Sequence, residues 1–499
     1  MRGDPLDSAA RGRQGSAMPD LRPVGYVIGL LSAVLGATMT VPMAVDFGSE
    51  NGHWPAFLQS AILTCLIGGL MAVACANGVG ERLSLQQTFL LATGVWVALP
   101  LFGALPFLFG ATGARPVDAF FEAMSGLTTT GATVFTGLED LPAGLLLWRS
   151  MLQWFGGVGI IIVAMVFLPE LRVGGMQIFR SEAFDTGGKV LPRAAEIAAQ
   201  IMGIYVGLTV SCAAAYMTVG MTGFDSVNHA LTTMSTGGFS TSDASFGAYQ
   251  GVPEYLASIF MVLASLPFVR YVQMLAGSSG PMLRDPQVRA FLWTITVLVA
   301  IVTAYRILAN GDHLEHAFRE ALFNVSSIIT GTGYASVDYQ LWGQFPIVLF
   351  FFIGLIGGCA GSTCCSVKIF RYQLLIASVR AQIRRIHSPN GLFTPRYQGQ
   401  PVTEEVMSSV MAFLGVFVVS LGLIAVALSL TGLDFVTSIS GAATAIANIG
   451  PGLGEIIGPA GNFAAINDTA KWILTVAMLL GRLELLVVLV IFLPRFWRT

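Results

Sequence analysis

Charged residues are scarce in this chain of 499 residues, since Asp, Glu, Lys and Arg together make up 11% of it. A soluble globular protein is about 25% charged, so this composition excludes an ordinary soluble domain. Hydrophobic residues reach 54%, and many apolar runs approach the ~20 residues that a helix needs to cross a bilayer. The sequence therefore predicts a polytopic membrane protein. The formal net charge of −2 gives no strongly basic surface, and we expect no nucleic-acid partner.

Residues that bind metals or perform catalysis are also few. No CxxC pair occurs, and no cysteines and histidines show the spacing of a zinc site. The five histidines are scattered, and no residues resemble a nucleophile with its base. We therefore expect neither a bound cofactor nor an enzyme; a polytopic membrane transferase or protease is the alternative class. The six cysteines lie in or beside apolar runs and are expected to pack as small residues: Cys65, Cys75, Cys212, Cys359, Cys364 and Cys365.

The connections between apolar segments divide into two classes by charge. One class, which includes both chain ends, holds nearly all Lys and Arg, whereas residues 221–250 and 432–468 hold none. Cytoplasmic loops are enriched in Lys and Arg, so both termini are predicted to be cytoplasmic. Residues 1–23 are polar and Arg-rich without an apolar core, which predicts a disordered cytoplasmic tail rather than a signal peptide. The ten predicted spans are 24–45, 56–77, 88–110, 144–169, 195–220, 251–276, 288–308, 344–378, 404–431 and 469–493.

Four short glycine-bearing loops recur on the predicted outer side. Each follows a mildly apolar stretch that could form a half-helix, such as Ala119–Leu127 or Ala317–Ile328, and each precedes a long apolar segment. A single such loop is most simply a surface turn, but four at matching positions indicate four units around one axis. The loops are Thr128–Thr133, Met234–Phe239, Thr330–Ala335 and Ala447–Gly452.

We accordingly predict an all-α membrane protein with four helix–pore-loop–helix repeats around a central pore. Two extra transmembrane helices precede the repeats. The predicted divisions are a tail at 1–23, the extra helices at 24–80, and repeats at 81–180, 181–283, 284–400 and 401–499.

The composition of the loops suits the passage of a cation. A cation that enters a membrane exchanges its water for oxygen ligands, and converging backbone carbonyls can supply them. Glycine tolerates the unusual φ angles that this arrangement requires. A half-helix that points its C-terminus at the axis adds partial negative charge. Non-helical backbone is tolerated at this depth only where it lines water or is buried in protein.

The chain resembles the Trk/Ktr/HKT superfamily of potassium transport proteins, and within it the TrkH type. The resemblance covers nearly the whole length, including the two extra N-terminal spans. It rests on the four loops and on three further stretches, Leu168–Glu182, Gly357–Thr363 and Leu480–Glu484.

The resemblance implies a selectivity filter at the four loops, with the aligned glycines at its centre. Gly131 resembles the potassium-selective pattern, because sodium-preferring relatives often carry Ser there. The implied K⁺ ligands are the carbonyls of Thr130, Thr236, Thr332 and Ile449. The implied filter residues are Thr129, Thr130, Gly131, Thr236, Gly237, Thr332, Gly333, Asn448, Ile449 and Gly450.

The eighth predicted span, 344–378, is too long for one simple helix across a ~30 Å core. Its middle contains four glycines followed by Ser362 and Thr363, which predicts a break in the helix, although a close helix–helix contact is the alternative. The resemblance implies that the break is an intramembrane gate. Cys364 and Cys365 stand where the family usually has further glycines, which suggests a stiffer loop. The gate residues are predicted to be Gly357, Gly358, Gly361, Ser362, Thr363, Lys368 and Arg482.

Arg482 lies deep inside the apolar run of the last span. A charge at this depth costs at least ~2.5 kcal/mol on insertion scales, which makes it a functional candidate. The resemblance implies that it projects toward the pore below the filter; the alternative is an anchor for nearby carbonyls. Lys368 is expected either at the cytoplasmic mouth or as a positive-inside anchor.

The sequence thus predicts a K⁺-conducting subunit of a Trk-type uptake system in the bacterial cytoplasmic (inner) membrane. The resemblance implies a homodimer and a cytosolic TrkA-like nucleotide-binding ring. This chain has no nucleotide-binding fingerprint of its own, so gating by a ligand would need that partner. Sodium- or proton-coupled K⁺ symport is the alternative within transport, and the sequence does not separate it from channel-like flow.

Overall fold

The computed structural model describes residues 19–78, 83–163, 174–176 and 190–497. Most of this part of the chain is helical, and its strands are the two-residue pair β1 (Arg396–Tyr397) and β2 (Gln400–Pro401). Most of the predicted tail at 1–23, and most of Leu168–Glu182, lie outside the described residues.

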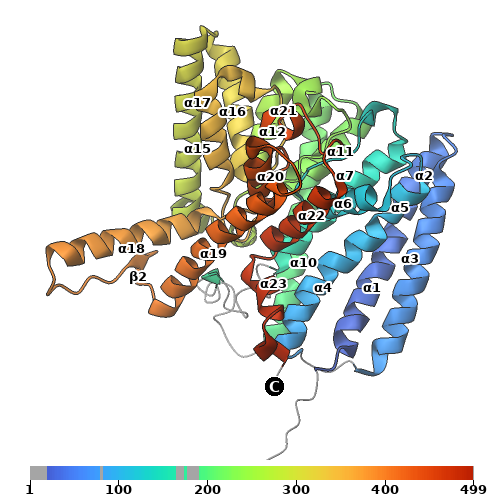
Figure 1. Ribbon diagram of the computed structural model, residues 1–499, viewed down its shortest axis with the longest axis horizontal. Helices are drawn as coiled ribbons and strands as arrows, with labels where there is room; N and C mark the ends of the chain where they lie inside the picture. The colour runs from blue at the N-terminus through green and yellow to red at the C-terminus, as the bar shows by residue number, and fades with distance from the viewer. Residues whose placement is uncertain (1–18, 79–82, 164–173, 177–189, 498–499) are drawn as a thin grey trace, which may run out of the picture.

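The N-terminal helices α1 (Arg22–Thr38), α2 (Thr40–Gly48) and α3 (Trp54–Cys75) form a flank on one side of the molecule (Figure 1). Helices α1 and α3 approach closely through glycine. A Cβ atom on Gly29 would lie 2.6 Å from Ala72 N, and one on Gly68 would lie 2.7 Å from Ala33 N. Small residues allow such contacts between helices in lipid, where the hydrophobic effect does not drive association.

The remaining helices form four units of the predicted order: a long helix, a short half-helix and a returning helix. Each half-helix begins at a polar residue or at proline; Thr222 and Asp434, for example, accept hydrogen bonds from the first-turn amides of Asp225 and Thr437. The first unit comprises α4 (Leu85–Gly103), α5 (Leu105–Phe109), the half-helix α6 (Pro116–Leu127) and α7 (Ala143–Ile162). The second comprises α10 (Val190–Thr218), the half-helix α11 (Gly223–Met234), α12 (Val252–Ala264) and α13 (Phe268–Leu275), with α14 (Gly280–Arg284) after it. The third comprises α15 (Pro286–Tyr305), the half-helix α16 (Leu314–Thr330), α17 (Gln344–Gly354) and α18 (Ile369–His387). The fourth comprises α19 (Glu404–Ser429), the half-helix α20 (Phe435–Ala447), α21 (Gly454–Ile457), α22 (Asp468–Arg482) and α23 (Leu486–Ile491).

Seven helices are long and apolar enough to cross a membrane in the described part of the chain, or eight if the bent pair α12–α13 is one span. Three of the ten predicted spans are interrupted; the break in the first was predicted, and those in the other two were not. The segment 344–378 breaks after Gly354 and resumes at Ile369, as its glycines predicted. The segment 251–276 bends by 89° between Ala264 and Phe268, where Pro267 lacks an amide donor and disfavours helix in the residue before it. The segment 469–493 breaks after Arg482.

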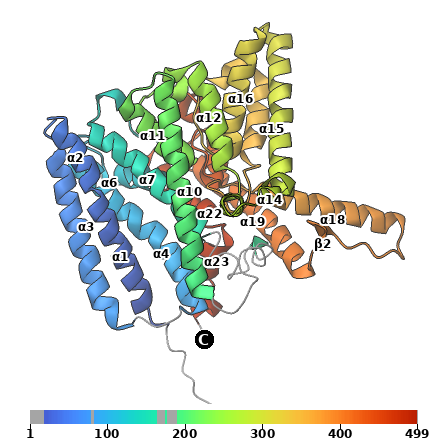
Figure 2. The ribbon, with the colours of Figure 1, turned by 180° about the vertical axis from the view of Figure 1, so that it is seen from behind.

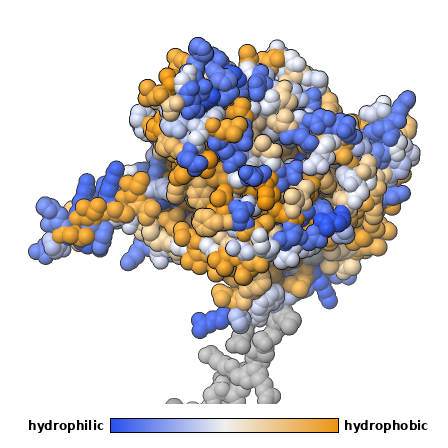
Figure 3. All heavy atoms as spheres, turned by 45° about the horizontal axis from the view of Figure 1, so that its top comes forward, coloured by the Kyte–Doolittle hydropathy of each residue, from blue (hydrophilic) through white to orange (hydrophobic). Residues whose placement is uncertain are grey.

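The two ends of the described chain lie on the same side of the molecule (Figures 1 and 2). The half-helices α11 and α16 and the short helix α21 lie toward the opposite side. Helix α18 projects sideways from the body, and the hairpin of β1 and β2 runs back beneath it (Figure 1). The exposed part of α18 carries Ile383 and Ile386 beside Arg384 and Arg385, so hydrophilic and hydrophobic side chains alternate along this helix (Figure 3).

Candidate functional site

All four half-helices end in the same hydrogen-bonded turn. Just beyond each helix, one residue adopts left-handed backbone, and its N–H bonds to the carbonyl three residues before it. The next N–H bonds to the carbonyl five residues before it, as in Thr130 N to Ser125 O at 2.8 Å and Ile449 N to Thr444 O at 3.0 Å. This is the Schellman closure of a helix C-terminus. The left-handed residues are Thr129, Thr236, Gly331 and Asn448, with φ of 53°, 51°, 75° and 53°.

Two residues after each left-handed residue stands a glycine with positive φ. These glycines are Gly131, Gly238, Gly333 and Gly450, with φ of 82°, 76°, 79° and 107°. The sequence alignment on Gly237 is therefore wrong by one residue in the second repeat, because the φ of Gly237 lies outside the left-handed region. The adjacent pair Gly237-Gly238 offered two registers, and only the backbone turn distinguishes them.

The corrected glycines and the residues before them form a closed ring. A Cβ atom on Gly131 would overlap the carbonyl oxygen of Gly237, one on Gly238 that of Thr332, and one on Gly333 that of Ile449. A Cβ atom on Gly450 would lie 2.9 Å from the carbonyl oxygen of Thr130 and complete the circuit. Each glycine thus lets the next loop bring a backbone carbonyl against it. The corrected set of carbonyls is Thr130, Gly237, Thr332 and Ile449, with Gly237 in place of Thr236.

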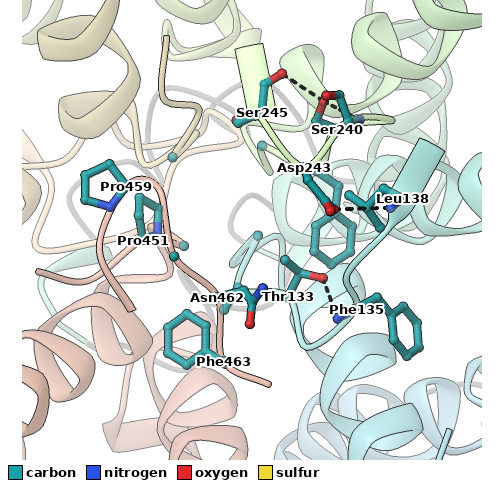
Figure 4. Close-up of a pocket in the computed structure, with 18 of the residues that line it drawn as sticks. Thr133, Phe135, Leu138, Ser240, Asp243, Ser245, Pro451, Pro459, Asn462 and Phe463 are labelled. Carbon is teal, nitrogen blue, oxygen red and sulfur yellow. Dashed lines mark hydrogen bonds between the residues drawn. The ribbon is translucent and has the colours of Figure 1, made fainter. Parts of the chain in front are cut away.

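A hollow of about 220 Å³ opens beside the ring and is lined by all four glycines (Figure 4). Thr133, Ser240, Asp243 and Ser245 lie along one side of it, and Pro451, Asn462 and Phe463 lie along the other. The lining combines glycines and apolar residues with several neutral polar side chains, and its charged members are Arg149 and Asp243. At its edge, Ser242 donates a hydrogen bond to Glu139, and this bond holds the pKa of the carboxyl below its ordinary value.

Three polar side chains behind the ring were not predicted from the sequence. Glu122 accepts from Thr133 Oγ1 at 2.9 Å and pairs with buried Arg149 at 2.8 Å. His229 bonds Ser240 Oγ at 3.0 Å, and Asn324 donates to Ser336 Oγ at 3.0 Å. Each stands nine residues before its glycine (131−122, 238−229 and 333−324). With the corrected register, this interval indicates in the sequence a polar side chain that joins three of the four half-helices to the segment that follows the ring.

Below the ring, the segment 355–368 joins α17 to α18 and contains six of the seven predicted gate residues. The bend between α12 and α13 holds it in place: Phe268 N donates to Gly361 O at 2.9 Å, and Thr363 Oγ1 donates to Ala264 O at 3.0 Å. Thr236, from the second loop, donates to Thr363 Oγ1 at 3.2 Å. The segment therefore contacts the underside of the ring directly.

Arg482 is 1% exposed and closes this contact from the other side. Its guanidinium donates to Gly156 O at 2.8 Å, to Thr363 O at 3.4 Å and to Cys365 Sγ at 2.5 Å. It therefore joins α7, the segment 355–368 and α22. The interpretation as an anchor for carbonyls describes these contacts, and they also place its charge beside Thr363. All six cysteines are free, including Cys364 and Cys365.

Lys368 is buried rather than exposed at a cytoplasmic mouth. It donates to Glu484 Oε1 at 2.6 Å, and Arg371 bonds the other oxygen of the same carboxylate. Glu484 lies just after the end of α22, and its backbone is left-handed, with a φ of 61°. The three charges therefore join the start of α18 to the break in the last span.

Comparisons with known proteins agree with this architecture. A family model described as TrkH, cation transport protein, matches residues 53–499. The chain is 43% identical to the Trk system potassium uptake protein TrkI of Halomonas elongata, over 95% of this chain and 97% of that one. It is 36% identical to the Trk system potassium uptake protein TrkH of Escherichia coli K12, over 96% of this chain and 99% of that one.

Among solved structures, the crystal structure of the potassium transporter TrkH from Vibrio parahaemolyticus superposes with a TM-score of 0.89 at 32% identity. The superposition covers 96% of this chain and 100% of that one. The family transports ions and is not a family of enzymes. From the ring of four loops, the four repeats and these matches, we conclude that the chain belongs to the TrkH family of cation transport proteins.

Proposed function

We propose that this chain is the K⁺-conducting subunit of a Trk-type uptake system and that the ring of four loops is its selectivity filter. The observation that carries the proposal is the closed circuit of carbonyls and glycines. Carbonyls from four loops replace the hydration shell of a cation, and four half-helix C-termini add partial negative charge. The ligands are the carbonyls of Thr130, Gly237, Thr332 and Ile449, with Gly131, Gly238, Gly333 and Gly450 allowing their approach.

The proposed gate is the segment 355–368 together with Arg482. The hydrogen bond between Thr236 and Thr363 supports this assignment, because it joins the segment to the filter loop above it. Arg482 adds a fixed positive charge at the same level. Opening would require the segment to leave both contacts. The ion pairs of Glu484 hold α18, and a force applied to α18 from the cytoplasm would therefore reach the gate.

We further propose that the protein works as a homodimer in the bacterial cytoplasmic membrane, with both termini inside, and that a cytosolic nucleotide-binding ring regulates it. The relatives described as Trk system proteins support a multisubunit assembly. The four repeats would correspond to residues 81–180, 181–283, 284–400 and 401–499.

The test is K⁺ or Rb⁺ flux into liposomes that contain only the purified protein. We expect uptake driven by the K⁺ gradient alone, and a K⁺ rate well above the Na⁺ rate. An imposed Na⁺ or H⁺ gradient that is obligatory for K⁺ movement would establish symport instead. Absence of K⁺ flux under every gradient, with the cytosolic partner present, would refute the proposal.

A further inference from the structure

The second loop lacks a side chain that the other three loops possess. The residue before the ring glycine is Thr130, Thr332 or Ile449 in those loops, but Gly237 here. The two threonines brace their loops: Thr130 Oγ1 bonds Thr128 Oγ1 at 2.7 Å, and Thr332 Oγ1 bonds Thr330 Oγ1 at 2.8 Å. Gly237 has no such support, and glycine is the residue with the most backbone freedom to lose.

Gln153, from α7 of the first repeat, occupies the vacant space. Its Nε2 donates to Gly237 O at 2.7 Å, and its Oε1 accepts from Phe239 N at 3.0 Å. A Cβ atom on Gly237 would lie 2.5 Å from Oε1 and 2.8 Å from Nε2. Since the φ of Gly237 is not left-handed, the glutamine, rather than the backbone, excludes a side chain at this position.

The side chain of Gln153 is held firmly. It is fully buried, and α7 packs against both half-helices α6 and α11. Gly156, on the same helix, comes so close to the carbonyl of Leu127 that a Cβ atom would overlap it, and one on Gly157 would lie 2.9 Å from Ser235 Cα. A neutral carboxamide supplies one donor and one acceptor in a fixed plane. A carboxylate of the same size could accept from Phe239 but could not donate to Gly237.

We infer that Gln153 is a positioning residue that replaces the missing side chain of the second loop and sets the discrimination between K⁺ and Na⁺ at the junction of the first two repeats. This inference rests on the proposed filter function. It assigns the role to a residue outside the loops, on a helix whose sequence carries no ion-binding pattern.

The first test measures the K⁺-to-Na⁺ flux ratio in liposomes for Gln153→Leu, which keeps the size and removes both hydrogen bonds. We expect the ratio to fall by roughly tenfold, because the variant loses the hydrogen bond to the carbonyl of Gly237 and the one from the amide of Phe239. Gln153→Glu, which keeps the acceptor alone, should also lower it, and it decides the question if the Leu variant does not fold. The matched control is Ser150→Ala, one turn away on α7, because Ser150 Oγ bonds only the carbonyl of Leu146 in its own helix; its ratio should equal the parent's.

The second test is a rescue. Gly237→Thr alone should lower the ratio, because the new side chain collides with Gln153. Combined with Gln153→Ala, it should restore much of the ratio, because the second loop then resembles the first and third. The inference is overturned if the K⁺-to-Na⁺ flux ratio of the double variant, relative to the parent, is no higher than the product of the relative ratios of its two single variants. It is also overturned if the ratio is unchanged in both Gln153→Leu and Gln153→Glu.

Gly238→Ala separates this outcome from failure of the filter itself. If Gly238→Ala lowers the ratio and the Gln153 variants do not, the filter stands and Gln153 is only a packing residue. If none of these variants changes the ratio, the filter lies elsewhere and both proposals fail.

Discussion

At the scale of single residues, the absence of one carbon atom is what lets the four loops meet. Gly131, Gly238, Gly333 and Gly450 each combine a left-handed φ with a neighbouring carbonyl oxygen within 2.9 Å of the position that a Cβ atom would take. Any other residue would strain the backbone and push that carbonyl away. The same reasoning separates these glycines from Gly137, which also has a positive φ of 68° but has nothing within 4 Å of its Cβ position.

Gly131→Ser should therefore reduce the K⁺-to-Na⁺ flux ratio in liposomes, because its Cβ atom would displace the carbonyl of Gly237. Gly137→Ser is the matched control, since it bears similar backbone strain in the same connection with open space around it. We expect roughly 1 kcal/mol or more of strain in both variants but altered selectivity only in the first. An unchanged ratio in folded Gly131→Ser would remove this residue from the filter.

Arg482→Ala should raise the basal K⁺ flux and weaken its dependence on the cytosolic partner. Two unit charges ~6 Å apart repel by about 3 kcal/mol at an effective dielectric constant of ~20, which corresponds to roughly a hundredfold in rate. Removal of the guanidinium also releases Thr363 and Gly156. Selectivity should stay close to that of the parent, since the ring is untouched. If basal flux is unchanged while folded yield falls, Arg482 is only an anchor, and the gate lies in the segment 355–368 alone.

At the scale of elements, the returning helices of the second, third and fourth repeats are interrupted below the ring. The interruption is the bend between α12 and α13, the segment between α17 and α18, and the break between α22 and α23. The segment between α17 and α18 contacts both of the other breaks: the bend holds it through Ala264 and Phe268, and Glu484 at the last break binds Lys368. Backbone groups freed by the breaks find partners in the neighbouring breaks, as a membrane interior requires.

Glu484→Gln tests this coupling between elements. It leaves the buried cations Lys368 and Arg371 without their carboxylate, and removal of one partner from a buried ion pair costs about 3–5 kcal/mol. We expect a clearly lower thermal unfolding midpoint in detergent and a higher basal flux, because α18 loses its tie to α22. Glu455→Gln, at an exposed carboxylate, is the control and should change neither. An unaltered midpoint in Glu484→Gln would contradict the pairing described for this carboxylate.

At the scale of the whole molecule, four copies of one unit surround a single ring, and the N-terminal flank lies outside the circuit. The units are unequal: the second loop is hydrogen-bonded by Gln153 of the first repeat, and the segment 355–368 that contacts the ring from below belongs to the third repeat. The half-helices α11 and α16 and the short helix α21 lie toward the side opposite to the chain ends (Figure 1). The distribution of Lys and Arg predicts that this side faces outward.

Cysteine labelling tests that orientation. Single cysteines at Glu50 and Ala244, both exposed, should react with an impermeant thiol reagent added outside intact cells. A cysteine at exposed Gln398 should react only after the cells are permeabilised, so that the reagent reaches the cytoplasmic face. The parent for these variants carries Ser at Cys65 and Cys75, the two half-buried cysteines, because the other four are buried. The reverse labelling pattern would invert the topology.

The sequence by itself determined the membrane class, the fourfold repeat, the half-helices and the break after Gly354, because composition, apolar length and glycine clusters are local properties. It also singled out Arg482, since a charge inside an apolar run is visible without a structure. Only the tertiary structure decided the register of Gly237-Gly238, the contacts of Glu122, His229, Asn324 and Gln153, and the pairing of Lys368 with Glu484. These depend on which groups from distant segments meet, and a carbonyl of one repeat facing a glycine of the next leaves no pattern along the chain.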